Sequence, residues 1–282
     1  MSAVTVAAIQ CAFSENLAEN IERTSDLIEQ GANRGANIIL PPELLQGRYF
    51  CVEEKEKHFD SAFPADKHPV VSALAMVAKK LKVVIPASIF ERDGQHYYNS
   101  LAMIDADGEV LGTYRKSHIP DGPGYEEKFY FRPGNTGFRA WPTKFGKIGV
   151  GICWDQWFPE AARAMMLLGA DILFYPTAIG SEPDHPEFDT KMLWQRAMVG
   201  HAVSNMVSVV AANRTGTENG QVFYGSSFIT DQCGEILQEM GRYEEGVITA
   251  KIDINEARRN RAAFGFFRDR RPDLYKILTN DK

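Results

Sequence analysis

Apolar residues in the first half of the chain form short runs that alternate with longer stretches of helical spacing. Short β-branched runs are typical of buried strands, and apolar residues three and four positions apart are typical of amphipathic helices. The predicted strands cover residues 4–9, 36–40, 83–89, 97–104 and 109–114. The predicted helices cover residues 16–33 and 70–80. The turn 105–108 (Asp-Ala-Asp-Gly) joins the last two strands as a hairpin.

The second half of the chain repeats this order of elements. Its predicted strands cover residues 148–152, 170–175 and 207–212, its helices residues 160–168 and 194–204, and a hairpin turns at 231–234. The segments 35–42 and 169–176 also match in sequence, as do residues around the two hairpin turns. These matches indicate an internal repeat. The alternative is that the short identities reflect only common turn chemistry.

Two copies of a β-α-β-α-β-β unit predict an α/β fold in which two similar layers pack on each other. We expect a four-layer α-β-β-α sandwich with a pseudo-two-fold repeat. No linker rich in Pro, Gly or Ser separates the halves, which favours a single domain over residues 1–282. Residues from about 251 to 282 lie outside the repeat and are expected to form a C-terminal extension that packs on the domain or on a partner subunit.

Composition narrows the class of protein. The net charge of −6 argues against a general nucleic-acid binder. No apolar run approaches the roughly 20 residues that span a bilayer, and the N-terminus lacks the basic region of a secretory signal. The 4 cysteines include no CxxC pair, so a reducing cytoplasm is the expected compartment. The 6 histidines include no HExxH spacing, so no metal site is expected.

The segment 147–160 carries the first candidate for chemistry. A predicted strand stops at Cys153, and a helix is expected to begin near Pro159. Gly149 and Gly151 are expected to let another backbone approach closely. A thiol at such a junction lies near exposed N–H groups, which would favour the thiolate. Cys153 is therefore a candidate nucleophile.

Two more functional groups follow predicted strands. Glu43 follows the strand at 36–40, and Lys116 follows the strand that ends at Tyr114. A carboxylate could take the thiol proton and later activate water, while an ammonium could stabilise an oxyanion. Each residue also has a structural interpretation when it is taken singly. Glu43 is then a loop carboxylate, Lys116 a surface charge and Cys153 a small buried side chain. A Cys–His pair with His118 is the main alternative mechanism.

Three segments resemble the signature segments of the nitrilase (carbon–nitrogen hydrolase) superfamily: Pro42-Glu43, Tyr114-Arg115-Lys116-Ser117-His118 and Gly151-Ile152-Cys153-Trp154-Asp155. The resemblance covers essentially the whole chain and implies an α-β-β-α sandwich. It also implies that Glu43 is the general base, Lys116 the oxyanion cation and Cys153 the nucleophile, without a cofactor. A second family glutamate corresponds to Glu127, with Glu126 as the alternative. The resemblance further implies a homo-oligomer.

Two further segments, 118–128 and 175–183, resemble those of the N-carbamoylputrescine amidohydrolases within this superfamily. The resemblance implies a substrate with a distal ammonium. Such a substrate needs a carboxylate and apolar or aromatic walls. The candidate substrate-binding residues are Asp121, Glu182, Tyr49, Tyr125 and Trp154. Alternatively, Asp121 only stabilises a Pro-Asp-Gly turn. Other interpretations of the chain are a β-ureidopropionase, an ω-amidase or a non-catalytic small-molecule binder.

Overall fold

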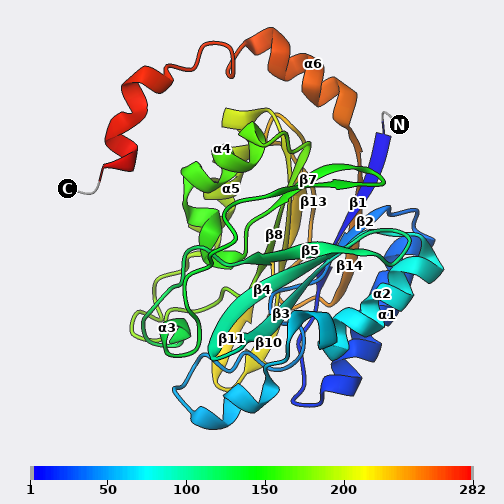
Figure 1. Ribbon diagram of the computed structural model, residues 1–282, viewed down its shortest axis with the longest axis vertical. Helices are drawn as coiled ribbons and strands as arrows, with labels where there is room; N and C mark the ends of the chain where they lie inside the picture. The colour runs from blue at the N-terminus through cyan, green and yellow to red at the C-terminus, as the bar shows by residue number, and fades with distance from the viewer. Residues whose placement is uncertain (1–2, 281–282) are drawn as a thin grey trace.

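The computed structural model describes residues 3–280, so the outermost residues of the predicted domain lie outside the described range. Two sheets lie face to face, with helices on both outer faces (Figure 1). The strands of the first sheet are, in spatial order, β14 (Gly246–Asp253), β1 (Ala3–Gln10), β2 (Ile38–Leu40), β3 (Ile85–Asp93), β4 (His96–Ile104) and β5 (Val110–Arg115). The strands of the second sheet are β13 (Ile236–Glu239), β12 (Phe228–Thr230), β9 (Ser208–Asn213), β8 (Ile172–Thr177), β7 (Gly146–Val150) and β6 (Ala140–Thr143).

The first sheet consists of two three-stranded pieces that meet between β2 and β3. Ile38 forms a parallel bridge with Val84, and the Ile39 N–H donates to the Val84 carbonyl at 2.9 Å. A separate hairpin is formed by β10 (Thr215–Glu218) and β11 (Gln221–Tyr224). The helices are α1 (Leu17–Asn33), α2 (Pro69–Leu81), α3 (Glu127–Tyr130), α4 (Pro159–Leu167), α5 (Lys191–Asn205) and α6 (Ile254–Phe264). Short 3-10 helices cover Glu56–Ser61, Ala65–Lys67, Cys153–Trp157 and Pro272–Thr279.

The four layers follow from the alternation of side chains along the strands. In β1, Val4 and Val6 face inward and pack with residues of the second sheet such as Ile148. Ala7 and Ile9 face outward and pack against α1 and α2. The second sheet behaves in the same way, because its outward side chains pack against α4 and α5. The predicted α-β-β-α sandwich is therefore confirmed.

The two halves also share the topology that the repeat predicted. Strands β1, β2 and β3 are parallel neighbours, as are β7, β8 and β9. In each half an antiparallel hairpin then extends the sheet, β4–β5 in the first and β12–β13 in the second. The matching segments 35–42 and 169–176 therefore run through the corresponding strands β2 and β8.

The edge strand β14 was missed by the sequence analysis. It pairs antiparallel with all of β1, from Ala3 opposite Asp253 to Gln10 opposite Gly246. The predicted start of the C-terminal extension, at about residue 251, thus falls inside a strand of the first sheet. Most side chains of this strand are half-buried, and 3 of its 8 residues are charged or glycine. Its sequence therefore shows neither a continuous apolar run nor a clear alternation of apolar and polar residues.

The extension proper begins with α6. Two arginines attach this helix to the domain: Arg258 forms an ion pair with Asp171 at 2.9 Å, and Arg261 donates to the Met206 carbonyl at 2.9 Å. Phe267 still packs against the cluster formed with α4 and α5, and the chain then arches away from the sandwich (Figure 1). In this last part, Leu274, Ile277 and Leu278 are exposed. Within residues 3–280, no helix has the length and apolar character needed to cross a membrane.

Candidate active site

Glu43, Lys116 and Glu127 meet in the interior, although they come from three separate segments. Glu43 lies three residues after β2, Lys116 directly follows β5, and Glu127 begins α3. The Lys116 Nζ donates to Glu43 Oε1 at 2.9 Å and to both carboxylate oxygens of Glu127, at 2.7 and 3.0 Å. All three side chains are at most 1% exposed. One buried cation therefore holds two carboxylates together.

The two oxygens of Glu43 have different environments. Oε1 accepts hydrogen bonds from Lys116 and from Asn99 Nδ2, the latter at 2.6 Å. Among residues 3–280, Oε2 has no hydrogen-bond partner although it is buried. A buried carboxylate oxygen without a donor is able to accept a proton, which is the property required of a general base.

Cys153 begins the 3-10 helix that follows β7, and its backbone has a positive φ of 41°. This conformation is uncommon for a residue with a side chain and marks a tight turn. Asp155 stabilises the turn, because its Oδ2 accepts from the Ile152 N–H at 2.9 Å and from the Tyr114 hydroxyl at 2.7 Å. The Cys153 Sγ lies 3.7 Å from the Ala178 carbonyl oxygen.

The glycines near this turn make room for side chains, and not for another backbone as the sequence analysis expected. A Cβ on Gly151 would lie 2.9 Å from the Tyr175 ring and 3.1 Å from the Asp155 Cβ. A Cβ on Gly149 would lie 2.9 Å from side-chain atoms of both Leu173 and Met165. The helix predicted near Pro159 is α4, which begins at that residue.

Electrostatics at the site overturn the prediction of a stabilised thiolate. Burial, reinforced by the charge of Glu43 and only partly opposed by Lys116, raises the pKa of the Cys153 thiol well above its ordinary value. Burial alone would lower the pKa of Lys116, but Glu127 and Glu43 outweigh it and raise that pKa. Burial, opposed by Lys116 and reinforced by Glu43, raises the pKa of Glu127 to about 7. The resting thiol is therefore neutral, and its proton must be removed by a base when it reacts.

Cys153 opens onto a cavity of about 460 Å³. Four of the five predicted substrate-binding residues line it: Asp121, Glu182, Tyr125 and Trp154. Its other lining residues are Pro120, Gly122, Pro123, Trp157, Ala178, Ile179, His185, Phe188, Thr190 and Leu193. No lysine or arginine is found among these described lining residues, so the cavity presents carboxylates, one histidine and apolar walls.

Tyr49 was wrongly predicted to be a wall of this cavity. Its side chain is completely buried, and its hydroxyl donates to Glu127 Oε1 at 2.8 Å. The sequence placed Tyr49 near the site but could not show which way its ring points. The choice between the two glutamates is resolved by burial: Glu127 contacts Lys116, whereas Glu126 is partly exposed and has no such contact among the described residues.

The contacts of the His118 ring do not suit a catalytic base. Its Nδ1 lies 2.7 Å from Asp155 Oδ1, and its ring stacks on Phe158 with a centroid distance of 3.6 Å. It is not among the described residues that line the cavity next to Cys153. The geometry thus favours Glu43 over a Cys–His pair.

Comparisons with known proteins show the family of this chain. Residues 5–262 match the carbon–nitrogen hydrolase family model. The chain belongs to the carbon–nitrogen hydrolase (nitrilase) superfamily. The chain is 52% identical to a citrullinase of Francisella tularensis over 98% of both chains, and 52% identical to an N-carbamoylputrescine amidase of Arabidopsis thaliana over 98% of this chain and 95% of the relative.

Among solved structures, a carbon–nitrogen hydrolase from Helicobacter pylori superposes with a TM-score of 0.93 at 37% identity, covering 99% of each chain. The protein is accordingly an enzyme that hydrolyses amide-type C–N bonds.

The sequence did not identify two residues that lie beside the segment carrying Glu43, namely Arg214 and Glu218. Arg214 directly follows β9, and Glu218 ends β10. Both side chains are fully or almost fully buried and form an ion pair. The position of Arg214 directly after a strand, like that of Lys116 after β5, was the signal that could have identified it.

Proposed function

We propose that this enzyme hydrolyses N-carbamoylputrescine to putrescine, CO2 and ammonia. One observation carries the proposal: Cys153 opens onto a cavity that contains two carboxylates, Asp121 and Glu182, and no lysine or arginine among its described lining residues. A cavity of about 460 Å³ lies in the usual size range of small-molecule sites, roughly 300–1,000 Å³. A cationic, flexible carbamoyl amine complements this charge and shape.

Glu182 is the carboxylate proposed to bind the distal ammonium. Burial raises its pKa, with an opposing effect from His185, and it has no ion-pair partner among residues 3–280. Asp121, by contrast, lies 3.8 Å from Lys128, so it is already partly neutralised. A bound ammonium would relieve the unfavourable burial of the Glu182 charge. Apolar side chains such as Phe188 and Leu193 would contact the four-carbon chain.

The proposed first half-reaction forms a thioester. The Cys153 Sγ attacks the ureido carbon while Glu43 Oε2 takes the thiol proton. Lys116 stabilises the negative charge that develops on the carbonyl oxygen. Glu43 then gives the proton to the terminal nitrogen, the C–N bond breaks, and ammonia leaves a carbamoyl thioester on Cys153.

The proposed second half-reaction releases the amine. Glu43 removes a proton from a water molecule, which attacks the thioester carbon, and the C–S bond breaks as Cys153 regains its proton. The product is an N-alkyl carbamate, which decomposes to putrescine and CO2. The proposal is supported by the charge interactions of Cys153 with Glu43 and Lys116, and by the hydrogen bond from Lys116 to Glu43.

Citrulline is a second candidate, since one relative at 52% identity is a citrullinase. Citrulline has the same ureido group and a distal ammonium, but it also carries a carboxylate. A carboxylate bound in the cavity would lie near Asp121 and Glu182 with no lysine or arginine lining the wall. The same argument disfavours the acid substrate of a β-ureidopropionase. A non-catalytic binder would have no use for the Glu43–Lys116–Cys153 arrangement.

Ammonia release distinguishes these candidates. The purified enzyme would be incubated with N-carbamoylputrescine, citrulline, N-carbamoyl-β-alanine and a simple ω-amide, and kcat/KM compared. The proposal expects the highest value for N-carbamoylputrescine, and preference for any acid-bearing substrate would overturn it. Cys153→Ser is the matched control for the nucleophile, and normal turnover by this variant would exclude a role for the thiol.

The proposed setting is the cytoplasm, in polyamine synthesis from agmatine. All 4 cysteines are free, which suits a reducing compartment. Fractionation of the source cells with an antibody to the enzyme tests the location. Deletion of the gene should lower cellular putrescine and accumulate N-carbamoylputrescine, and unchanged amounts of both would contradict the proposed pathway.

A homo-oligomer is also proposed. The segment after Gly265 exposes the apolar side chains of Leu274, Ile277 and Leu278, and a cavity of about 610 Å³ lies between this segment and the start of α4. A second copy of the chain could cover these side chains. Light scattering of the full chain and of a chain ending at Gly265 tests this proposal. A full-length monomer at micromolar concentration would refute it.

A further inference from the structure

Arg214 reaches from the second sheet to the backbone of the segment that carries Glu43. Its guanidinium donates to the Glu43 carbonyl at 2.9 and 3.2 Å, to the Leu44 carbonyl at 2.5 Å and to the Gly47 carbonyl at 3.0 Å. The side chain is completely buried. Arginine presents five N–H donors in a rigid planar arrangement, so one residue can hold three carbonyls of a turn.

Glu218 continues this network on the other end of the same segment. It forms a buried ion pair with Arg214, and its Oε2 accepts from the Tyr49 N–H at 2.8 Å. Its Oε1 accepts from the Phe13 N–H at 2.9 Å. Tyr49 in turn donates its hydroxyl to Glu127 at 2.8 Å. Arg214 and Glu218 are thus connected to both carboxylates of the site. They reach Glu43 through its backbone carbonyl and Glu127 through Tyr49.

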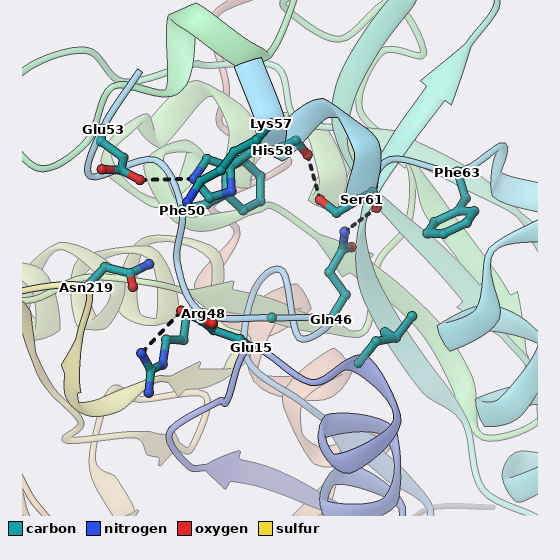
Figure 2. A pocket seen from close by; sticks show the side chains of 12 residues that line it. Glu15, Gln46, Arg48, Phe50, Glu53, Lys57, His58, Ser61, Phe63 and Asn219 are labelled. Carbon is teal, nitrogen blue, oxygen red and sulfur yellow. Dashed lines mark hydrogen bonds and ion pairs between the residues drawn. The ribbon is translucent and has the colours of Figure 1, made fainter. Parts of the chain in front are cut away.

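The segment 43–49 needs such support for two reasons. Leu44 has a positive φ of 47°, a conformation that a residue with a side chain rarely adopts. In addition, Gln46, Arg48 and Phe50 border a separate cavity of about 390 Å³ (Figure 2). Hydrogen bonds from Arg214 therefore add to the packing of Leu44 and Tyr49 in holding the segment.

We propose that Arg214 and Glu218 act as a positioning pair that holds Glu43 and, through Tyr49, Glu127 in register with Lys116. The inference rests on the proposed catalytic role of Glu43. A displacement of about 1 Å at a reacting group can lower the rate about 100-fold. Loosening this segment should therefore slow the chemical step while leaving the cavity that binds substrate unchanged.

The test uses Glu218→Gln, which keeps the size of the side chain but removes its charge and turns one acceptor into a donor. The new NH2 group faces either the Phe13 N–H, at the position of Oε1, or both Arg214 and the Tyr49 N–H, at the position of Oε2. Arg214→Lys keeps the charge but cannot reach all four acceptors at once. The matched control is Arg261→Lys, because Arg261 also donates to two backbone carbonyls, those of Asn205 and Met206, and none of these residues lines the cavity at Cys153. Each purified full-length variant is compared with the parent in kcat, KM, melting temperature and the rate of Cys153 alkylation by iodoacetamide.

The expected result is a loss of about 100-fold in kcat for both variants, less than about threefold change in KM, and slower alkylation, with Arg261→Lys unchanged. Folded Glu218→Gln with parental kcat and alkylation would overturn the proposal, as would an effect on KM alone. If Arg214→Lys does not fold, Glu218→Gln decides the question. Alkylation needs no substrate, so slower alkylation supports the positioning role even if N-carbamoylputrescine proves to be the wrong substrate.

Discussion

The substitution Glu43→Gln tests the assignment of the general base with little disturbance of the fold. In the parent, only Oε1 of Glu43 accepts hydrogen bonds, from Asn99 and Lys116. A glutamine can place its carbonyl oxygen at this position and keep both bonds. Its NH2 group then occupies the position of Oε2, which has no partner among the described residues. The change therefore removes the proton acceptor and the negative charge but keeps the hydrogen bonds of Oε1.

The expected loss of activity follows from the state of the thiol. Burial raises the pKa of Cys153, so the proton must be transferred as the Sγ attacks. Loss of a positioned base typically costs about 10²- to 10⁴-fold in rate, or about 3–5 kcal/mol of activation free energy. The free energy of unfolding should fall by about 1–3 kcal/mol, because both hydrogen bonds are retained but the new NH2 group is buried without an acceptor among the described residues.

The assay is ammonia release under saturating substrate, with urea unfolding to verify the fold. Glu126→Gln is the matched control: it makes the same chemical change at a partly exposed residue next to Glu127 and should keep parental kcat. Less than a tenfold loss of kcat in folded Glu43→Gln would refute the argument. An inactive His118→Ala enzyme together with an active Glu43→Gln enzyme would favour a Cys–His pair instead.

Three further predictions concern the cavity, a buried histidine and the turn. Glu182→Gln should raise KM for N-carbamoylputrescine about tenfold or more, and Asp121→Asn less, because a hydrogen bond to a charged group contributes about 1.5–3 kcal/mol; equal KM values in steady-state ammonia release would contradict the choice of Glu182. Burial lowers the pKa of His68 to about 4, so the unfolded chain is protonated first as the pH falls below about 6.5. The folded state should therefore lose about 2 kcal/mol between pH 7.5 and 5, and His68→Asn should abolish this loss in urea unfolding; an unaltered pH dependence would exclude His68 as its source. Gly151→Ala should lower the unfolding free energy by about 1–3 kcal/mol, because the new Cβ meets the Tyr175 ring at 2.9 Å; an unchanged melting temperature would show that the ring moves freely.

The resting state of the site explains why these residues act as a unit. Two carboxylates and one ammonium are buried together, so removing Lys116 leaves two buried carboxylates without a cation, whereas removing one carboxylate leaves the other still paired. Lys116→Met should therefore cost stability as well as activity. Urea unfolding of this variant should show a loss of about 3–5 kcal/mol, and parental stability would contradict the buried ion-pair arrangement.

The sequence by itself determined the layers, the repeat and the positions of Glu43, Lys116 and Cys153. Each depends on local information: an apolar run marks a buried strand, and a polar residue directly after that run lies at the end of the strand. Strands β2 and β8 could be matched because the segments 35–42 and 169–176, which run through them, share residues. The resemblance to a known family then gave these positions their proposed roles.

Tertiary structure decided what depends on contacts between distant segments. The weak pattern of β14 becomes a strand because β1 supplies its hydrogen-bond partners more than 200 residues earlier in the chain. Tyr49 points toward Glu127 and not into the cavity because Glu218, 169 residues away, holds its backbone. The neutral state of Cys153 follows from its burial beside Glu43, which reverses the effect expected from a helix end. Strand position can be predicted from neighbours in the sequence, whereas side-chain direction and proton affinity are set by neighbours in space.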